Sequence, residues 1–284
     1  MSPMNNRLLV PRKTPGLLDL VPGAAAAYSL RSLSRSYADP VVTVRRSSDD
    51  AEEDFTAAEV ADGTLAAFCG AGDGFVYRWW DQSGNARHAV ASADANEPQI
   101  VDAGVLVGLD NNPSISFDGS DDYLPHSVIE EDPSNLFLIS VNEIDSSAAF
   151  GTIWSHRSES TRVIQHTSAV ASGIVRTQIR GSGNNLVDLS NTVTFDTSHI
   201  TGFQFSKTQQ SHANFVDGVT GETSTEAFSG ETFTSTKNTI GATYTTSYTV
   251  FFKGKVSEIV VYKNHLDAST VSLLQGNIAW SYSQ

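Results

Sequence analysis

The sequence predicts an all-β protein folded as one β-sandwich, with a short helix near each end of the chain. Residues that favour helices are scarce, whereas Ser, Thr, Gly, Asn and Asp, which favour turns, are abundant. From about Ile100 to the C-terminus, short apolar or alternating runs recur between turn signals with the spacing typical of sandwiches. The length of 284 residues suits one large β domain with a substantial core.

Residues 1–25 are predicted to form an extended N-terminal arm, and residues 26–284 the sandwich domain. The first 16 residues combine three prolines with three basic residues, a composition typical of a segment that orders only on a partner. The residues expected to anchor the arm are Arg7, Leu8, Leu9, Arg12 and Lys13. Within Leu17–Leu33, a Pro-Gly break precedes an Ala-rich run whose apolar residues share one helical face, which predicts the N-terminal helix.

The chain is organised around Gly72–Ala89, where Trp79 and Trp80 precede the sequence DQSGN. Asp and Asn side chains hydrogen-bond their own backbone and Gly84 adopts positive φ readily, so a sharp turn is expected here. One interpretation is a structural corner held by buried indoles. The other is a platform of exposed Trp that binds sugar.

The elements on either side follow from local pattern. Before the Trp pair, Asp39–Arg46 is expected to be a strand, Ser47–Asp54 a loop and Asp62–Ala71 a short helix or turn. Later strands are expected within Asn112–Leu124 and at Leu136–Val141, Phe150–Ser155, Arg162–His166, Gly173–Ile179, Leu186–Leu189, His199–Ser206, Ser211–Val216, Val219–Thr223, Thr239–Ala242, Val250–Phe252 and Lys255–Lys263. Asp217-Gly218 predicts a tight hairpin.

The chain is predicted to end in a helix that begins after Asp267. Asp is a favourable N-cap residue, and Leu266 before it can pack against Val271. Val271, Leu274 and Ile278 lie on one helical face, so this helix is expected to pack on the sheet.

Composition argues against several classes of function. The net charge of −14 is unsuited to binding nucleic acid, although residues 1–46 hold seven Lys and Arg against two acidic residues. The single cysteine, Cys69, allows neither an intramolecular disulfide nor a Cys-based zinc site. No apolar stretch approaches 18 residues, and the N-terminus lacks the apolar segment of a signal peptide, so we expect neither membrane insertion nor signal-directed secretion.

Several stretches resemble known families. The sequences NPSISFDGSDDYL, ANFVDGV and NTIGA…FFKGKVSEIVVYKNHLDASTV resemble the concanavalin A-like, or laminin-G-like, lectin and glucanase superfamily. The upstream RRSSD and YRWWDQSGNARHA are similar to the N-terminal half of the α-L-arabinofuranosidase B catalytic domain. The resemblance implies a jelly-roll sandwich of two curved antiparallel sheets, with a concave face that commonly holds carbohydrate.

The resemblance also implies where catalytic groups should lie. A retaining glycosidase uses two carboxylates about 5 Å apart. The family's nucleophile lies in a segment ending Glu-Asn-Asn-Leu, and its acid/base follows Ile-Gly-Gly; the counterparts here are GSGNNL at Gly181–Leu186 and TIGAT at Thr239–Thr243. Neither counterpart holds the expected acid, and the family's adjacent cysteine pair is missing, so we expect a scaffold without glycosidase chemistry.

Other residues remain candidates for a site. Glu222, Glu226 and Glu231 flank the late hairpins as substitute carboxylates. Asp118, Asp121 and Asp122 are interpreted as turn residues, with a calcium site as the alternative. Sugar binding requires aromatic rings beside amides, and the residues expected to contact a ligand are Trp154, His156, Asn184, Asn185, Tyr244 and Tyr248.

These observations lead to one hypothesis and two rivals. We expect a non-catalytic, lectin-like virion protein of a tailed bacteriophage, either a tail or fibre adhesin or a head-surface decoration. Its basic arm would bind other virion proteins, its sandwich would bind a cell-surface glycan, and the particle would hold it as a homo-oligomer. The rivals are an arabinofuranosidase-type glycoside hydrolase that acts on host polysaccharide, and a structural block without sugar affinity.

Overall fold

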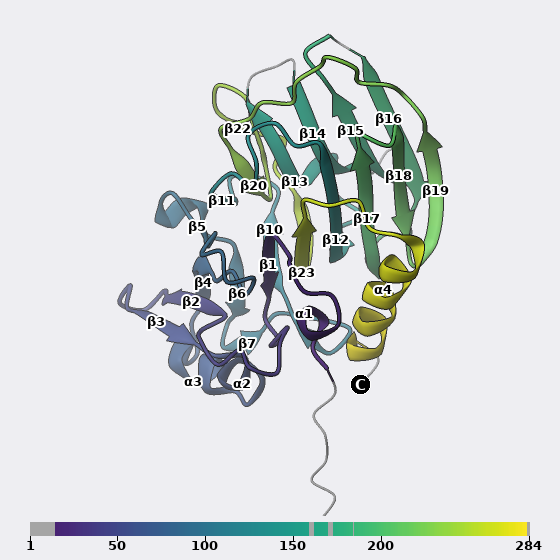
Figure 1. The fold of residues 1–284 in the computed structure, drawn as a ribbon. Helices are drawn as coiled ribbons and strands as arrows, with labels where there is room; N and C mark the ends of the chain where they lie inside the picture. Colours follow the sequence, from purple (N-terminus) through teal and green to yellow (C-terminus); the bar gives the residue numbers. More distant parts are fainter. Residues whose placement is uncertain (1–14, 159–161, 170–172, 184, 283–284) are drawn as a thin grey trace, which may run out of the picture.

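The computed structural model describes residues 15–158, 162–169, 173–183 and 185–282, and it confirms the all-β sandwich with a short helix near each end. Two sheets face each other in the upper part of the molecule, and the larger sheet continues into a lower lobe built by β2 to β6 with α2 and α3 (Figure 1). The predicted anchor residues Arg7 to Lys13 and the predicted ligand contact Asn184 lie outside the described residues.

In the part of the chain that the structure describes, the larger sheet has 13 antiparallel strands. Its path runs through β19 (Val219–Ser224), β18 (Ser211–Val216), β17 (Ser198–Ser206), β12 (Asn135–Ile144), β23 (Lys253–Tyr262), β10 (Ile115–Asp118), β6 (Gln99–Asp102), β4 (Gly74–Trp79), β2 (Val42–Arg46) and β3 (Glu52–Phe55). Outside that path, β1 (Ala26–Ser29) pairs with β23, β5 (Ala89–Val90) with β4, and β7 (Val105–Leu106) with β6.

The second sheet has six strands among the described residues. Their order is β11 (Leu124–His126), β20 (Asn238–Ile240), β13 (Phe150–Ser158), β14 (Arg162–Ala169), β15 (Ile174–Arg180) and β16 (Leu186–Thr192). Two small hairpins complete the β structure, β21 (Thr243–Tyr244) with β22 (Tyr248–Thr249) and β8 (Gly108–Leu109) with β9 (Asn112–Pro113).

The main core lies between the two sheets. Alternate residues of β15 and β16, such as Val175, Ile179 and Val187, pack in one buried cluster with Leu138 and Phe203 of the larger sheet. Strands β12 and β23 are buried on both faces, because helices cover the side that turns away from the core. This double burial explains why their sequences are nearly continuous apolar runs rather than alternating ones.

The helices are short except at the C-terminus. They are α1 (Leu17–Leu20), α2 (Ala57–Ala61), α3 (Thr64–Cys69) and α4 (Ala268–Tyr282), with a 3₁₀ turn at Asp94–Asn96. The predicted cap of α4 is confirmed, since Asp267 Oδ1 accepts a hydrogen bond from the Thr270 N–H at 2.8 Å. Leu274 and Ile278 of α4 are buried together with Leu17 of α1 against the larger sheet. None of the helices in the described ranges is long and apolar enough to span a membrane.

The structure corrects four sequence-based expectations. The N-terminal helix precedes the Pro-Gly break, and the Ala-rich run after it is the strand β1, because Ala26–Ser29 pairs with β23 in the core. The arm does not extend to residue 25, since Leu17 and Val21 are buried against α4. The expected loop at Ser47–Asp54 includes most of β3, and Val250–Phe252 lies between strands β22 and β23.

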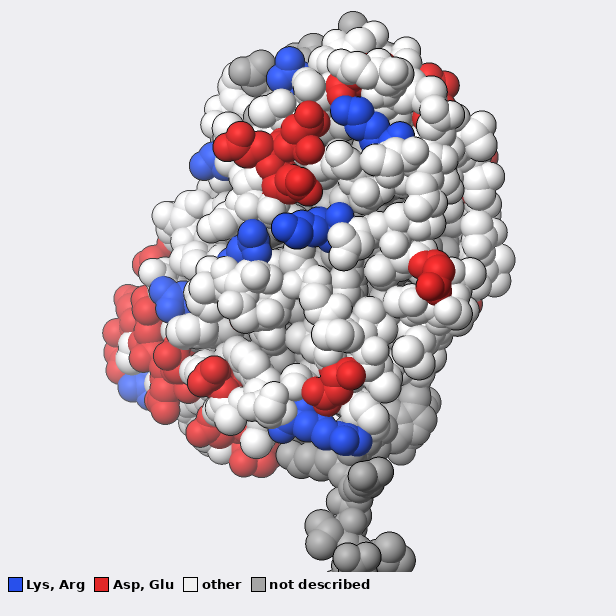
Figure 2. All heavy atoms as spheres, in the orientation of Figure 1, with Lys and Arg blue, Asp and Glu red and all other residues white. Residues whose placement is uncertain are grey.

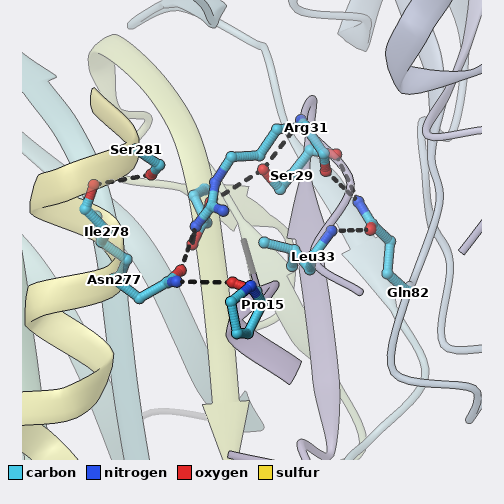
Figure 3. A network of polar contacts seen from close by, with 9 residues as sticks. Pro15, Ser29, Arg31, Leu33, Gln82, Asn277, Ile278 and Ser281 are labelled. Carbon is cyan, nitrogen blue, oxygen red and sulfur yellow. Dashed lines mark hydrogen bonds and ion pairs between the residues drawn. The ribbon is translucent and has the colours of Figure 1, made fainter. Parts of the chain in front are cut away.

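A polar network fixes the N-terminal segment to the C-terminal helix (Figure 3). Glu258 of β23 has a fully buried side chain, and its carboxylate accepts hydrogen bonds from the Arg31 guanidinium at 2.8 and 3.0 Å. The Ser29 hydroxyl donates to the same carboxylate at 3.0 Å. Asn277 of α4 accepts from Arg31 and donates to the Pro15 carbonyl. The described chain therefore begins against the body of the protein.

Candidate functional site

The outer face of the six-stranded sheet, which turns away from the core, is polar. Side chains alternate along β15, so that Val175, Thr177 and Ile179 are buried and Arg176, Gln178 and Arg180 lie on the opposite side. The register pairs Gln165 of β14 with Gln178, and Gln178 with Asp188 of β16. These positions bring amides, guanidinium groups and one carboxylate together on this side of the sheet, where Gln165 is buried and Gln178 and Asp188 are half-exposed.

A continuous row of hydrogen bonds crosses this face, and we call it the polar row. Thr243 Oγ1 lies 2.7 Å from Thr152 Oγ1 and donates to Gln165 Oε1 at 3.4 Å. Gln165 Nε2 donates to Gln178 Oε1 at 2.6 Å, and Gln178 Nε2 donates to Asp188 Oδ2 at 3.5 Å. Asp188 also forms an ion pair with Arg176, so the only charge in the row is neutralised.

The polar row lies where the resemblance places the acid/base group. Thr243 follows Ile240, Gly241 and Ala242, and it carries a hydroxyl group where the resemblance leads us to expect a carboxyl group. Within the described residues of β11, β13 to β16 and β20, Asp188 is the sole Asp or Glu. Retaining hydrolysis needs two carboxylates about 5 Å apart. With Asp188 as their sole acidic residue, these strands hold no such pair.

In the described part of Gly181–Leu186, the segment to which the resemblance assigns the nucleophile, the backbone hydrogen-bonds to Glu231 and Thr232. This segment begins the connection between β15 and β16, and Gly183 is five residues beyond Gln178, up to roughly 17 Å in extended chain. The Gly183 N–H donates to Glu231 Oε2 at 3.1 Å, and a Cβ at Gly181 would lie 2.0 Å from that same oxygen. The carboxylate of Glu231 therefore fills the space that a larger residue at Gly181 would need.

Two of the predicted ligand contacts are wrong, because Trp154 and His156 lie in the core. Trp154 is 0% exposed, and its Nε1–H donates to His126 Nε2 at 3.1 Å. His156 is 2% exposed; its Nε2–H donates to the Phe233 carbonyl, and its Nδ1 accepts from the Asn238 amide. Burial lowers the pKa of His156 to about 4. Both side chains support the sheet rather than a ligand.

The predicted tyrosines do come together. Tyr244 and Tyr248 face each other across the β21–β22 hairpin with ring centroids 5.0 Å apart, and Tyr123 stacks on Tyr248 at 3.8 Å. The Lys237 ammonium lies 5.5 Å from the centre of the Tyr244 ring. Tyr244 follows Thr243 of the polar row in β21. Asn185 is exposed in the β15–β16 connection, and its contact with a ligand stays a prediction.

The Gly72–Ala89 segment is a structural corner, as one interpretation predicted. Trp79 is fully buried, and the Asp81 carboxylate accepts from the backbone N–H groups of Ala27, Ser83 and Arg87 at 2.8 to 2.9 Å. These bonds fix the turn against β1. Trp80 differs from Trp79 because its ring is only half-buried.

Three aspartates form the cation-compatible group that the described residues contain. The ligand oxygens of Asp118, Asp121 and Asp122 lie within 4.8 Å of one another. Asp122 Oδ2 accepts from the Asp118 N–H and Asp118 Oδ1 accepts from the Ser120 N–H, which is turn geometry. Burial raises the pKa of Asp122 to about 7. The turn interpretation accounts for this geometry, and calcium stays a prediction.

Comparison with known proteins bears on the fold. The family described as "Alpha-L-arabinofuranosidase B, catalytic" matches residues 19–112. A solved GH54 α-L-arabinofuranosidase soaked with a cyclic sulfate inhibitor has a TM-score of 0.70 at 14% identity, over 93% of this chain and 64% of that chain. An arabinofuranosidase complexed with arabinofuranosyl-α-1,2-xylobiose gives the same values. A Trypanosoma rangeli sialidase in complex with sialic acid has a TM-score of 0.50 at 13% identity, over 70% and 31% of the two chains.

These likenesses confirm a sandwich of the arabinofuranosidase type and the resemblance of the upstream segment. At 13% to 14% identity they show the fold alone, and this chain spans 64% of the length of the two arabinofuranosidase chains. Comparison with curated proteins finds no match.

Proposed function

We propose that this chain binds carbohydrate without hydrolysing it, on the outer face of an arabinofuranosidase-type sandwich. The observation that carries the proposal is the polar row, in which Thr243 ends the segment expected to hold the acid/base and carries no carboxyl group, while Gln178 presents a half-exposed amide. Hydroxyl and amide groups form hydrogen bonds with sugar hydroxyls. They do not serve as the general acid, the general base or the nucleophile that carboxyl groups provide in a glycosidase.

The surroundings of the polar row support binding. The half-buried rings of Tyr244 and Tyr248 supply aromatic surface, which sugar binding requires beside polar groups. Arg157 Nη1 donates to Gln165 Oε1 at 3.3 Å, and burial, together with the neighbouring Arg180, lowers the pKa of Arg157. Two guanidinium groups near one row of amides favour a ligand with acceptor or anionic groups.

Calorimetric titration with arabinan oligosaccharides and host polysaccharide tests this proposal. Binding should weaken about tenfold or more, that is by about 1.4 kcal/mol, in Tyr248→Ala and Gln178→Ala. It should be unchanged in Tyr77→Ala, a matched variant on β4 outside this face. Equal loss in all three variants, or no binding by the intact protein, would contradict the proposal.

A glycoside hydrolase remains the second candidate, because one edge of the sandwich does gather carboxylates. A cavity of about 400 Å³ between β16 and β19 is lined by Asp188, Glu222 and Glu226. Glu222 Oε2 is held by the Ser190 N–H at 2.7 Å, whereas Asp188 is paired with Arg176. Sustained turnover of an aryl arabinofuranoside that disappears in Glu222→Gln or Glu226→Gln would establish this function and overturn the non-catalytic one.

We propose further that the chain is part of a tailed bacteriophage particle, as an adhesin or a head-surface decoration, bound to other virion proteins through its N-terminal arm. The support is the basic, proline-containing sequence of residues 1–16 ahead of a compact sandwich. Mass spectrometry of purified particles tests it. Particles that lack the chain, or that incorporate a form without residues 1–14 at the normal level, would contradict this assignment.

A further inference from the structure

A cavity of about 550 Å³ lies beside the DQSGN turn, on the lower lobe and away from the polar row. Its walls come from the loop before β2, the end of β3 and both sides of the turn, and they include Tyr37, Asp39, Asp54, Trp80 and His88. A volume of this size fits one or two sugar rings, since small-molecule sites span roughly 300–1,000 Å³. Figure 2 shows acidic side chains gathered over β3, α2 and α3 in the same lobe.

The aromatic wall is held in place by polar bonds. Trp80 Nε1–H donates to Thr43 Oγ1 at 2.9 Å, and the Thr43 hydroxyl donates to Asp54 Oδ1 at 2.6 Å. The half-buried ring of Tyr37 is fixed by its hydroxyl, which donates to the Pro40 carbonyl at 2.7 Å. The two hydrogen bonds of the Thr43 hydroxyl thus orient both the Trp80 indole and the Asp54 carboxylate before any ligand binds.

The cavity also keeps unused hydrogen-bonding capacity. Within the described residues, nothing donates to the exposed carboxylate of Asp39 or to Asp54 Oδ2. The Asp81 N–H donates to His88 Nδ1 at 3.1 Å, which places the His88 proton on Nε2 as a donor. Burial lowers the pKa of His88, so this ring is neutral at pH 7.

The loop that carries Tyr37 and Asp39 is anchored from behind. Gln82 is buried; its Oε1 accepts from the Leu33 N–H at 2.8 Å, and its Nε2 donates to the Ser29 and Arg31 carbonyls at 2.9 Å (Figure 3). The same motif that makes the structural corner therefore also shapes the cavity. Preorganisation of this kind lowers the entropy that a ligand must lose on binding.

We propose that this cavity binds a neutral sugar unit at a site separate from the polar row. Asp39 and Asp54 accept hydrogen bonds from sugar hydroxyls, His88 Nε2 donates one, and Trp80 and Tyr37 form the apolar wall. The two unneutralised carboxylates repel uronic and sialic acids, which sets the ligand class apart from the one favoured beside Arg157 and Arg180.

Nuclear magnetic resonance of the intact protein tests this site through the indole N–H signal of Trp80, identified as the signal missing from Trp80→Phe. Neutral monosaccharides such as arabinose and galactose should shift that signal at millimolar concentration, and glucuronate should not. Asp39→Ala should weaken the effect about tenfold or more, that is by about 1.4 kcal/mol. The matched variant Glu53→Ala, exposed on β3 outside the cavity, should leave it unchanged.

Three outcomes would overturn the site: no shift with any neutral sugar, an equal shift with glucuronate, or the same loss in Glu53→Ala as in Asp39→Ala. Asp39 makes no contact that folding requires, so its variant stays informative even where Trp80→Phe is destabilised. Tyr248→Ala distinguishes the two sites, because it should weaken binding at the polar row and leave the Trp80 signal responsive.

Discussion

Single buried charges in this protein are each held by a defined partner. Glu258 is the clearest case, since its side chain has no exposed area and Arg31 and Ser29 satisfy both of its oxygens. A buried ion pair of this kind adds little to folding stability when compared with a well-packed apolar pair. Loss of one partner is nevertheless costly, because it leaves the other charge buried and uncompensated.

Glu258→Ala should therefore lower the free energy of unfolding by about 3–5 kcal/mol, measured by urea denaturation. The matched control is Asp49→Ala, which removes the partner of Arg46 in an ion pair that is open to solvent. The control should have little effect. Equal losses in the two variants would show that burial does not set the contribution of these pairs.

Buried histidines make stability depend on pH. Burial lowers the pKa of His126 and His156 to about 4 and that of His166 to about 3. The unfolded chain binds protons at these sites below about pH 6.5 while the folded chain does not, so stability falls as pH drops from about 6.5 toward 4. Asp122, with its pKa raised to about 7, and Glu97, whose pKa burial also raises, act in the opposite direction, whereas burial lowers the pKa of His88 and His212 as well.

The urea midpoint should accordingly fall between pH 7 and pH 5. Each histidine contributes up to about 1.4 kcal/mol per pH unit to the slope. His166→Gln removes one of the three groups and should make the slope shallower by about that amount. A midpoint that stays constant or rises over this range would contradict the assigned protonation states.

At the scale of elements, packing rather than local propensity decides what a glycine contributes. Gly202 lies in β17 where a Cβ would be 2.1 Å from the Leu138 carbonyl oxygen and 2.5 Å from the Phe215 ring. Gly276 lies in α4 with no heavy atom within 4 Å of its Cβ position. The same chemical change at the two sites therefore has opposite consequences.

Gly202→Ala should destabilise the protein by about 1–3 kcal/mol through overpacking between β12 and β17. Gly276→Ala should stabilise it by up to about 1 kcal/mol, because alanine restricts the unfolded chain and favours the helix. Thermal unfolding of both variants measures the difference. If Gly202→Ala raised the unfolding temperature instead, β12 and β17 would be able to move apart without loss of stability, and the overpacking argument would be wrong.

At the scale of the whole molecule, the N-terminal segment belongs partly to the body. Leu17 is 0% exposed, and Ala24 and Ala25 are also buried, although all three residues fall within the predicted arm. The body therefore includes the residues from Pro15 onward, and the Pro15 carbonyl accepts a hydrogen bond from Asn277.

Removal of residues 1–14 should leave the unfolding temperature within a few degrees of the intact protein. Removal of residues 1–25 deletes α1 and two buried alanines, and exposes part of the core beside α4. This longer deletion should unfold at a markedly lower temperature or fail to fold. Similar unfolding temperatures for both forms would restore the boundary at residue 25.

The candidate sites could be predicted only in part. TIGAT and the tyrosines adjoin the polar row, as the resemblance and the composition suggested, because they lie close together in sequence. Gln165 and Gln178 were missed; the alternation in IVRTQI places Gln178 opposite the buried positions, whereas Gln165 lies in RVIQH, where the neighbouring residues are buried as well. Trp154 and His156 were misjudged because a sequence does not show which face of a strand meets a second sheet.

Local sequence pattern was enough to predict the DQSGN turn, the Asp217-Gly218 hairpin and the cap of α4, since each depends on neighbours within a few residues, and the spacing of strand and turn signals predicted the sandwich. Long-range packing made the Ala-rich run a strand, buried Leu17, Val21 and Ala24 with α4, and turned Trp80 but not Trp79 toward a cavity. These outcomes depend on distant partners, such as Thr43 for Trp80 at a separation of 37 residues and Glu258 for Ser29 at 229, and pairings at that range leave no local pattern in the sequence.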